Sequence, residues 1–159
     1  MENLEKGRKG ITIAHLYMKL YIASSWRNPY YPEVVKRLRD SGFEVYDFRN
    51  PPVGHGFKWS MVSEDYMEWT PAEYREQLQT NPLAHQQFAN DIEAMRSCDA
   101  CVLVLPCGCS AHTEAGWFAG SGKKVVAYLP EKVEPELMYG LFTAVTTSIE
   151  ETVAALKAE

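Results

Sequence analysis

Residues 100–106 read ACVLVLP, an unbroken apolar run within a chain of 159 residues. A run without polar alternation is typical of a central strand in a parallel sheet, because helices cover both faces of such a sheet. Shorter apolar segments alternate with helical patterns on either side of it. The run therefore predicts an α/β fold in which residues 100–106 form the middle strand.

The segments before and after this strand predict a complete sheet. Residues 19–25 (KLYIASS) and 43–48 (FEVYDF) are strand-like, and the helical pattern at 32–42 joins them into a right-handed β-α-β unit. Two more strands are expected at 123–130 and 143–148. We therefore expect a Rossmann-like (flavodoxin-like) doubly wound, mostly parallel five-stranded sheet with helices on both faces.

Helices are expected in further segments whose starts carry capping residues. Thr70 precedes Pro71 at one predicted start, and Ser148 precedes the last segment. Ser110 or a neighbour is expected to cap the helix that follows the middle strand. The predicted helices are 71–79, 82–98, 111–122 and 149–159, with a short turn or helix at 135–142.

The length of the chain is sufficient for one domain with a complete core. We expect residues 18–159 to form that domain and residues 1–17 to be an N-terminal extension. A stretch rich in proline, glycine and aromatic residues interrupts the domain at about 49–81. A segment of this length and composition is predicted to be an inserted lid at a binding site.

Composition argues against several kinds of partner. The net charge of −5 and the isoelectric point near 5.4 disfavour binding to duplex nucleic acid, which needs a basic face. The sequence has no apolar run of about 18 residues, and its first residues lack the apolar stretch of a signal peptide. These features predict a cytoplasmic protein without membrane contact.

All four cysteines fall between Cys98 and Cys109, a clustering unlike that of a secreted disulfide framework. About 20 Å of strand separates Cys101 from Cys107, too far for one zinc ion to bind both pairs, so we expect no metal. Cys98 and Cys101 are predicted to be core residues. Cys107 and Cys109 lie past the strand, and whether either thiol is reactive stays open.

Ligands of doubly wound sheets bind beyond the carboxyl ends of the strands. Three stretches follow predicted strands directly, at 23–28 (ASSWRN), 47–52 (DFRNPP) and 107–114 (CGCSAHTE). We expect the three to converge on one pocket. The candidate substrate-binding residues that they contribute are Ser24, Ser25, Trp26, Arg27, Asp47, Ser110 and His112.

Glu114 is the strongest catalytic candidate. It is expected in the first turn or so of its helix, where the dipole and free N–H groups favour an ionised carboxylate that can act as a nucleophile. The alternative is a capping-box role, in which Glu114 bonds back to the cap; the spacing fits a cap at Ala111 and is one residue too long for a cap at Ser110. His112 is either a general acid or base, or a residue of the pocket wall.

Four stretches in a fixed order resemble a known superfamily: YIASSWRN (21–28), NDIEAMRSCDACVLVLP (90–106), HTEAGW (112–117) and GKKVVAYL (122–129). This is the nucleoside 2-deoxyribosyltransferase-like superfamily, which includes the 2′-deoxynucleoside 5′-phosphate N-hydrolases and the CMP N-glycosidases. The resemblance spans about residues 19–139, which is nearly the whole predicted core.

The resemblance implies roles for three residues. Glu114 would attack the anomeric carbon, Asp91 would bind the sugar or help to protonate the leaving group, and Tyr21 would position nucleophile and sugar. The implied reaction cleaves the N-glycosidic bond of a (deoxy)nucleoside or nucleoside 5′-monophosphate, with transfer to water or another base. No cofactor is expected, and a homo-oligomer is implied. From the residues alone, Asp91 could instead be a solvated helix residue and Tyr21 a core residue.

Substrate contacts follow from the same resemblance. Ser25 and Arg27 match the phosphate-binding loop of the nucleotide hydrolases, whereas Ser110 lies nearer the glutamate than the serine that those relatives use. Trp59 in the lid could stack on a base or pack the lid onto its own domain. Met138 is a further candidate contact. Nucleoside and nucleotide substrates both stay open.

Two other functions fit the same residues. A TIR-like NAD-cleaving enzyme would use the same glutamate on a ribose. A non-catalytic nucleotide-binding or sensing module would use Glu114 to hold ribose hydroxyls. No GxGxxG motif follows Tyr21, which argues against an ordinary dinucleotide-binding dehydrogenase.

Overall fold

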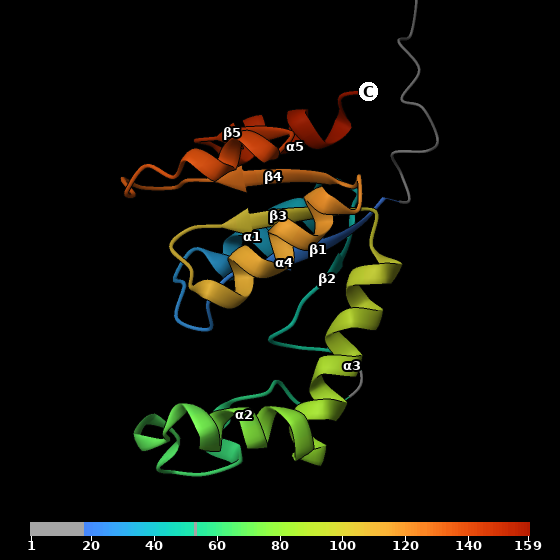
Figure 1. The fold of residues 1–159 in the computed structure, drawn as a ribbon. Coiled ribbons are helices and arrows are strands. Elements are labelled where there is room, and N and C mark those ends of the chain that lie inside the picture. The colour runs from blue at the N-terminus through green and yellow to red at the C-terminus, as the bar shows by residue number, and fades with distance from the viewer. Residues whose placement is uncertain (1–17, 53) are drawn as a thin grey trace, which may run out of the picture.

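The computed structural model describes residues 18–52 and 54–159, so the predicted extension at 1–17 lies outside the described residues. Its five strands form one sheet in the order β2-β1-β3-β4-β5, and every neighbouring pair is parallel (Figure 1). The α/β class and the central place of residues 100–106 are confirmed. The strands are β1 Lys19–Ala23, β2 Glu44–Tyr46, β3 Ala100–Val104, β4 Lys124–Tyr128 and β5 Ala144–Thr146.

Strand β3 divides the core into two layers. All five of its residues are buried, and successive side chains face opposite sides of the sheet. Val102 packs in a cluster with α1 and α5, whereas Leu103 packs in a cluster with α3 and α4. Helices therefore cover both faces, as predicted. Their bounds are α1 Tyr31–Asp40, α2 Pro71–Thr80, α3 Pro82–Ser97, α4 Cys109–Gly120 and α5 Ile149–Lys157.

The four cysteines are free thiols with two kinds of environment. Cys98 and Cys101 are 1% and 0% exposed and belong to the core layer under α3 and α4, as predicted. Cys107 is half-buried and Cys109 is exposed. The thiols at the two ends of β3 therefore differ in their access to solvent.

Two predicted helix starts are confirmed. Thr70 caps α2, and Glu73 bonds back to the Thr70 backbone in a capping box. Ser148 caps α5 by accepting a hydrogen bond from the Glu151 backbone N–H. In both cases the local sequence alone determines where the helix begins.

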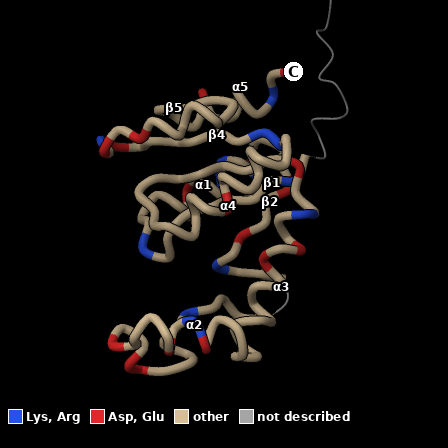
Figure 2. The backbone as a smooth tube through the Cα atoms, in the orientation of Figure 1, with Lys and Arg blue, Asp and Glu red and all other residues tan. Residues whose placement is uncertain are grey.

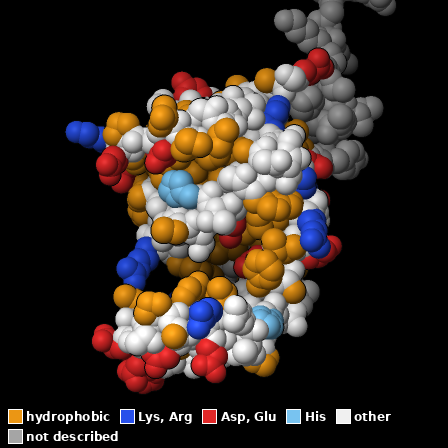
Figure 3. Space-filling model, in the orientation of Figure 1, with side chains coloured by type: hydrophobic (Ala, Val, Ile, Leu, Met, Phe, Trp, Pro, Cys, Tyr) orange, Lys and Arg blue, Asp and Glu red, His pale blue; other side chains and the backbone are white. Residues whose placement is uncertain are grey.

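The insert, residues 49–81, is partly helical. It contains two 3-10 turns, Trp59–Met61 and Tyr66–Glu68, followed by α2. Helix α2 packs against α3, and the two form a lobe beyond the edge of the sheet (Figure 1). Figure 3 shows a hollow between this lobe and the sheet layers. The aromatic contacts within the lobe centre on Trp59, whose ring lies 5.0–5.7 Å from those of Phe57, Trp69 and Tyr74.

Charged residues of both signs lie on the lobe and on the helices. Figure 2 shows acidic residues interspersed with Lys and Arg along α3 and the insert. Within the described part of the chain, no helix is both long and apolar enough to cross a membrane.

Candidate active site

The three residues expected to be catalytic line one cavity at the carboxyl edge of the sheet. Tyr21 comes from β1, Asp91 from α3 and Glu114 from α4. The cavity has a volume of about 240 Å³, and residues 57–59 of the insert form one of its walls. Segments far apart in the sequence therefore meet where a doubly wound sheet places its ligand. Further lining residues are Ser24, Trp26, Phe48, Gln87 and Ser110.

Glu114 lies in the second turn of α4, not in the first turn as predicted. The helix begins at Cys109 with Gly108 as its cap, and Gly108 makes no side-chain cap bond. The extended backbone of Gly108 (φ −100°, ψ −164°) lets the helix start soon after the strand ends. Glu114 is therefore the sixth helical residue, beyond the free N–H groups of the first turn. Capping by Ser110 or Ala111 is also wrong, and with it the capping-box alternative.

Burial decides the charge state of Glu114. Loss of solvation raises its pKa to about 7, the hydrogen bond from the Tyr21 hydroxyl lowers it, and the charge of Asp91 raises it. The prediction that its surroundings favour the ionised form of Glu114 is wrong, because desolvation raises the pKa above its ordinary value. Near neutral pH both protonation states of Glu114 are populated, which suits a group that acts first as nucleophile and then as leaving group.

Tyr21 is a core residue whose hydroxyl faces the site. Its side chain is 1% exposed, stacks on Tyr46 with ring centroids 5.5 Å apart, and packs against Phe118. Burial and the charges of Glu114 and Asp91 raise the pKa of the phenol. The hydroxyl therefore keeps its proton and donates a hydrogen bond to Glu114.

Asp91 lies half-buried near Glu114. Burial raises its pKa above the ordinary value, although a 2.8 Å hydrogen bond from Gln87 Nε2 to Asp91 Oδ1 opposes the shift. Each negative charge disfavours the other, so the pair binds a proton more tightly than two isolated carboxyl groups would. The cavity thus contains one carboxyl group that can attack and a second that can hold a proton.

The loop after β1 contributes two of its four expected residues to this cavity. Ser24 and Trp26 line it, whereas Ser25 and Arg27 do not. The Ser24 hydroxyl donates to the Val104 carbonyl at 2.9 Å, and Ser25 Oγ accepts from the Arg27 backbone N–H at 3.2 Å. Arg27 is exposed to solvent. The serines of this loop therefore hold its conformation.

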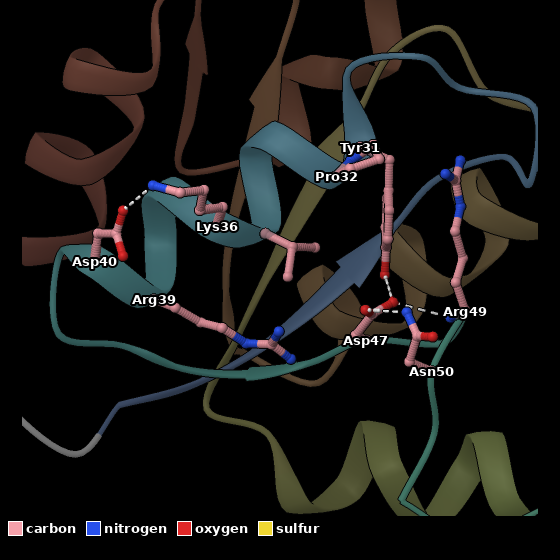
Figure 4. Close-up of a pocket in the computed structure, with 9 residues that line it drawn as sticks. Tyr31, Pro32, Lys36, Arg39, Asp40, Asp47, Arg49 and Asn50 are labelled. Atoms are coloured by element: carbon pink, nitrogen blue, oxygen red, sulfur yellow. Dashed lines mark hydrogen bonds and ion pairs between the residues drawn. The ribbon is translucent and has the colours of Figure 1, made fainter.

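Asp47 belongs to a different cluster, beside α1 (Figure 4). Its carboxylate accepts hydrogen bonds from the Tyr31 hydroxyl (2.8 Å), the Asn50 amide (2.9 Å) and the Arg49 backbone N–H (3.0 Å). Burial opposes ionisation, but the bonds from Asn50 and Tyr31 outweigh it and lower the pKa of Asp47. The Arg49 guanidinium donates to two backbone carbonyls of the loop after β1. The cluster supports that loop from outside the Glu114 cavity.

His112 and Met138 lie at another cavity, of about 590 Å³. Two residues along a helix correspond to a rotation of about 200°, so His112 and Glu114 face opposite sides of α4. His112 Nε2 lies 2.9 Å from the Tyr139 hydroxyl, and Nδ1 lies 2.9 Å from the Gly108 carbonyl oxygen. The structure does not bring His112 or Met138 to the cavity of Glu114.

Cys107 is a weak candidate for a reactive thiol. Its Sγ lies 3.6 Å from His112 Nδ1, but burial and the charge of Glu114 raise its pKa to about 12. A thiol with such a pKa is almost entirely protonated at neutral pH, and the thiolate is the nucleophilic form. Within residues 18–52 and 54–159, no group of three or more His, Cys, Asp or Glu side chains is placed to hold a metal ion.

Each of the three stretches that follow strands contributes to this cavity, as expected, and Phe48 is the contribution of 47–52. Four lining residues were not named individually from the sequence: Phe48, Phe57, Lys58 and Gln87. Gln87 precedes Asp91 by four residues on one helix, a spacing that places two side chains on the same face and was available from the sequence. Phe57 and Lys58 flank Trp59, which was expected. Their side chains enter the site because the turn at 59–61 brings the whole segment to the cavity.

No family model and no curated protein matches this chain, but solved structures share its fold. The 2-deoxyribosyltransferase of Bacillus psychrosaccharolyticus matches with a TM-score of 0.59 at 20% identity, covering 87% of this chain and 95% of that one. The Clostridium botulinum CMP N-glycosidase BcmB matches with a TM-score of 0.50 at 16% identity, covering 88% and 99%. A conserved protein from Enterococcus faecalis V583 matches with a TM-score of 0.57 at 15% identity, covering 89% and 98%. At 15–20% identity these likenesses show that the chain shares the fold of these proteins, which is the fold that the resemblance implied.

Proposed function

We propose that this protein cleaves the N-glycosidic bond of a (deoxy)nucleoside or nucleoside 5′-monophosphate and passes the sugar to water or another base. The observation that carries the proposal is the half-buried pair of Glu114 and Asp91, with Tyr21 donating to Glu114, at the carboxyl edge of the sheet. Two of the proteins with a similar fold are a 2-deoxyribosyltransferase and a CMP N-glycosidase, which supports this class of reaction.

In the first step the ionised form of Glu114 attacks the anomeric carbon. A bond forms between a carboxylate oxygen and C1′, the C1′–N bond breaks, and its electron pair leaves with the base. Positive charge develops on the sugar in the transition state, and a carboxylate on one face stabilises it. The hydrogen bond from Tyr21 restrains the carboxyl group of Glu114 during this attack.

The departing base nitrogen needs a proton as the bond breaks. Asp91 is suited to supply it, because burial raises its pKa above the ordinary value and it therefore holds a proton more readily than an exposed aspartate does. Gln87 fixes the orientation of this acid by its hydrogen bond to Oδ1. In the reacting form of the pair Glu114 is ionised and the shared proton lies on Asp91, from which it passes to the departing nitrogen.

The second step releases the sugar from Glu114. Water attacks C1′ in hydrolysis, whereas a nitrogen of a second base attacks it in transfer, and in both cases the carboxylate of Glu114 leaves. The attacking group loses a proton, which Asp91 can now accept. Two displacements at C1′ retain the configuration of the sugar.

The proposal is tested by incubating the protein with nucleosides, nucleoside 5′-monophosphates and NAD, and by following base release by chromatography. We expect release of a nucleobase from a nucleoside or nucleotide and no release in Glu114→Gln. A second free base is added to detect transfer as a new nucleoside. Nicotinamide release from NAD alone would favour the NAD-cleaving alternative. Ligand binding without turnover by the wild-type protein would favour a binding module.

A further inference from the structure

Two cavities meet at the catalytic carboxyl groups. Glu114 and Asp91 line both the cavity of about 240 Å³ and an adjoining groove of about 650 Å³. The reacting carbon must lie beside Glu114, so it sits at this junction. A nucleoside carries its base on C1′ and its 5′ group across the sugar ring, so the two substituents extend into the two different cavities.

The groove fits the base. Besides Asp91 and Glu114, none of its lining residues is a Lys, Arg, Asp or Glu, and its walls are mainly aromatic and aliphatic. Flat rings stack favourably on aromatic side chains, and apolar walls suit an uncharged ligand. The residues that only the groove contains include Tyr74, Leu78, Phe88, Met95 and Trp117.

The smaller cavity therefore receives the 5′ side of the sugar, and its wall holds one cation. Lys58 lines this cavity and does not line the groove. Its Nζ lies 5.3 Å from the centroid of the Trp26 ring. Among the described residues, the ion pairs formed by lysines involve Lys19 and Lys36, so the Lys58 ammonium group is available to a ligand.

The backbone segment that carries Lys58 is held in place by its neighbours. A Cβ atom on Gly56 would lie 2.1 Å from Trp26 Cζ2, so the backbone of the insert packs directly on the indole ring. Trp26 in turn packs edge-to-face on Phe48, with ring centroids 5.2 Å apart. The adjacent Trp59 is held by its aromatic partners within the insert. The chain on either side of Lys58, at Gly56 and Trp59, is thus anchored, and the exposed Lys58 side chain lines the cavity from this segment.

We propose that Lys58 recognises an anionic group on the 5′ side of the sugar, so that the substrate is a nucleoside 5′-monophosphate. This inference rests on the proposed function for the orientation of the substrate. It moves the anion contact from the loop after β1, where Ser25 and Arg27 were expected to provide it, to the insert. A lysine ammonium group binds phosphate through charge-assisted hydrogen bonds.

The test compares a nucleoside with its 5′-monophosphate in the wild-type protein, in Lys58→Met and in Arg27→Met. We expect the wild-type protein to prefer the monophosphate. Lys58→Met should lower kcat/KM for the monophosphate by roughly 10- to 100-fold and leave the nucleoside within about twofold. Arg27→Met, which removes an exposed cation of similar length from the neighbouring loop, should leave the ratio unchanged. Lys58→Arg should restore part of the preference.

A binding experiment separates this inference from the proposed function. Calorimetry with a nucleoside 5′-monophosphate is run on Glu114→Gln, with and without Lys58→Met. Weaker binding in the double variant supports the anion site even if no base is ever released, a result that would sink the proposed reaction. Equal binding, an equal loss for both substrates in Lys58→Met, or an equal effect of Arg27→Met would overturn the inference while leaving bond cleavage intact.

Discussion

Helix α4 presents an ionisable side chain on each of two opposite sides, and the surroundings of the two side chains differ. On one side Glu114 is buried beside Asp91 and receives one hydrogen bond from Tyr21. On the other side His112 has a polar neighbour within 2.9 Å at each ring nitrogen, the Gly108 carbonyl and the Tyr139 hydroxyl. The imidazole also stacks on the Tyr139 ring. Glu114 can therefore accept further hydrogen bonds in a site with little water, whereas each ring nitrogen of His112 already has a hydrogen-bond partner.

This difference separates a reactive group from a structural one. A buried carboxyl group with few partners has a raised pKa and gains strongly from a nearby positive charge, such as a developing oxocarbenium ion. An imidazole held by two hydrogen bonds and a stacked ring fixes the segment at 137–141 against α4. Proximity in the sequence to a catalytic residue therefore does not imply a shared role.

The largest effect should follow from removing the nucleophile. Glu114→Gln keeps the shape of the side chain but cannot attack C1′, so we expect base release to fall by at least about 10³-fold. His112→Gln on the other face should keep activity within about fivefold. Initial rates of base release on the same substrate measure both. Comparable losses in the two variants would contradict the division between the faces.

The next effect concerns stability. The folded pKa of Glu114 is about 7 and its ordinary value is 4.5, so the protonated group costs nothing below pH 4.5, and stability is lost as pH rises through 7. A pKa difference of that size corresponds to roughly 3 kcal/mol. Glu114→Gln should therefore be more stable than wild type by up to that amount at pH 9 and equal to it at pH 4. Urea unfolding at both pH values measures the difference.

A matched control for this measurement is Glu93→Gln, because Glu93 is exposed on α3. It should change the free energy of unfolding by less than about 0.5 kcal/mol at either pH. A Glu114→Gln protein that is less stable than wild type at pH 9 would show that its carboxylate is stabilised in the fold.

A smaller effect is expected from the partners of the nucleophile. The acid limb of kcat/KM should have an apparent pKa of about 7, because Glu114 must be ionised to attack. Tyr21→Phe removes a hydrogen bond that lowers this pKa, so the limb should move to higher pH and the rate at pH 7 should fall about tenfold. Asp91→Asn removes a charge that raises it, so the limb should move to lower pH. Movement in the opposite directions would refute the electrostatic account.

The smallest effect should come from the thiols. Cys107→Ser and Cys109→Ser should each keep base release within about twofold, because burial raises the pKa of the Cys107 thiol to about 12 and Cys109 is an exposed residue of the groove. If alkylation inactivates the wild-type protein and also inactivates both serine variants, the inactivation comes from modification of residues other than Cys107 and Cys109. A tenfold loss in Cys107→Ser would give the thiol a role in catalysis.

Local signals in the sequence were sufficient for the sheet. The apolar run at 100–106 marks the middle strand, and Thr70 and Ser148 mark helix starts whose bonds lie within four residues. Parallel topology predicts that the segments after β1 and β3 meet at one edge of the sheet, which brings Glu114 close to β1. The place of Asp91 beside them was implied by the resemblance.

The remaining features depend on contacts that no local pattern contains. Helix α4 starts at Cys109, two residues before the predicted start, and its periodicity places His112 on the side away from Glu114. The raised pKa of Glu114 depends on how many atoms surround it after folding. The place of Lys58 depends on the packing of Gly56 against an indole ring from another segment. Such contacts between distant segments become visible only in the assembled fold.

The insert enters the chain between β2 and α3, whereas Tyr21 and Glu114 belong to elements outside it. Changes in its length or composition therefore leave the register of the five strands unaltered. A variant with a different segment between β2 and α3 should therefore bind different ligands while it keeps Tyr21 and Glu114 in place. Ligand choice can therefore change through residues 49–81 without a change in the groups that break the bond.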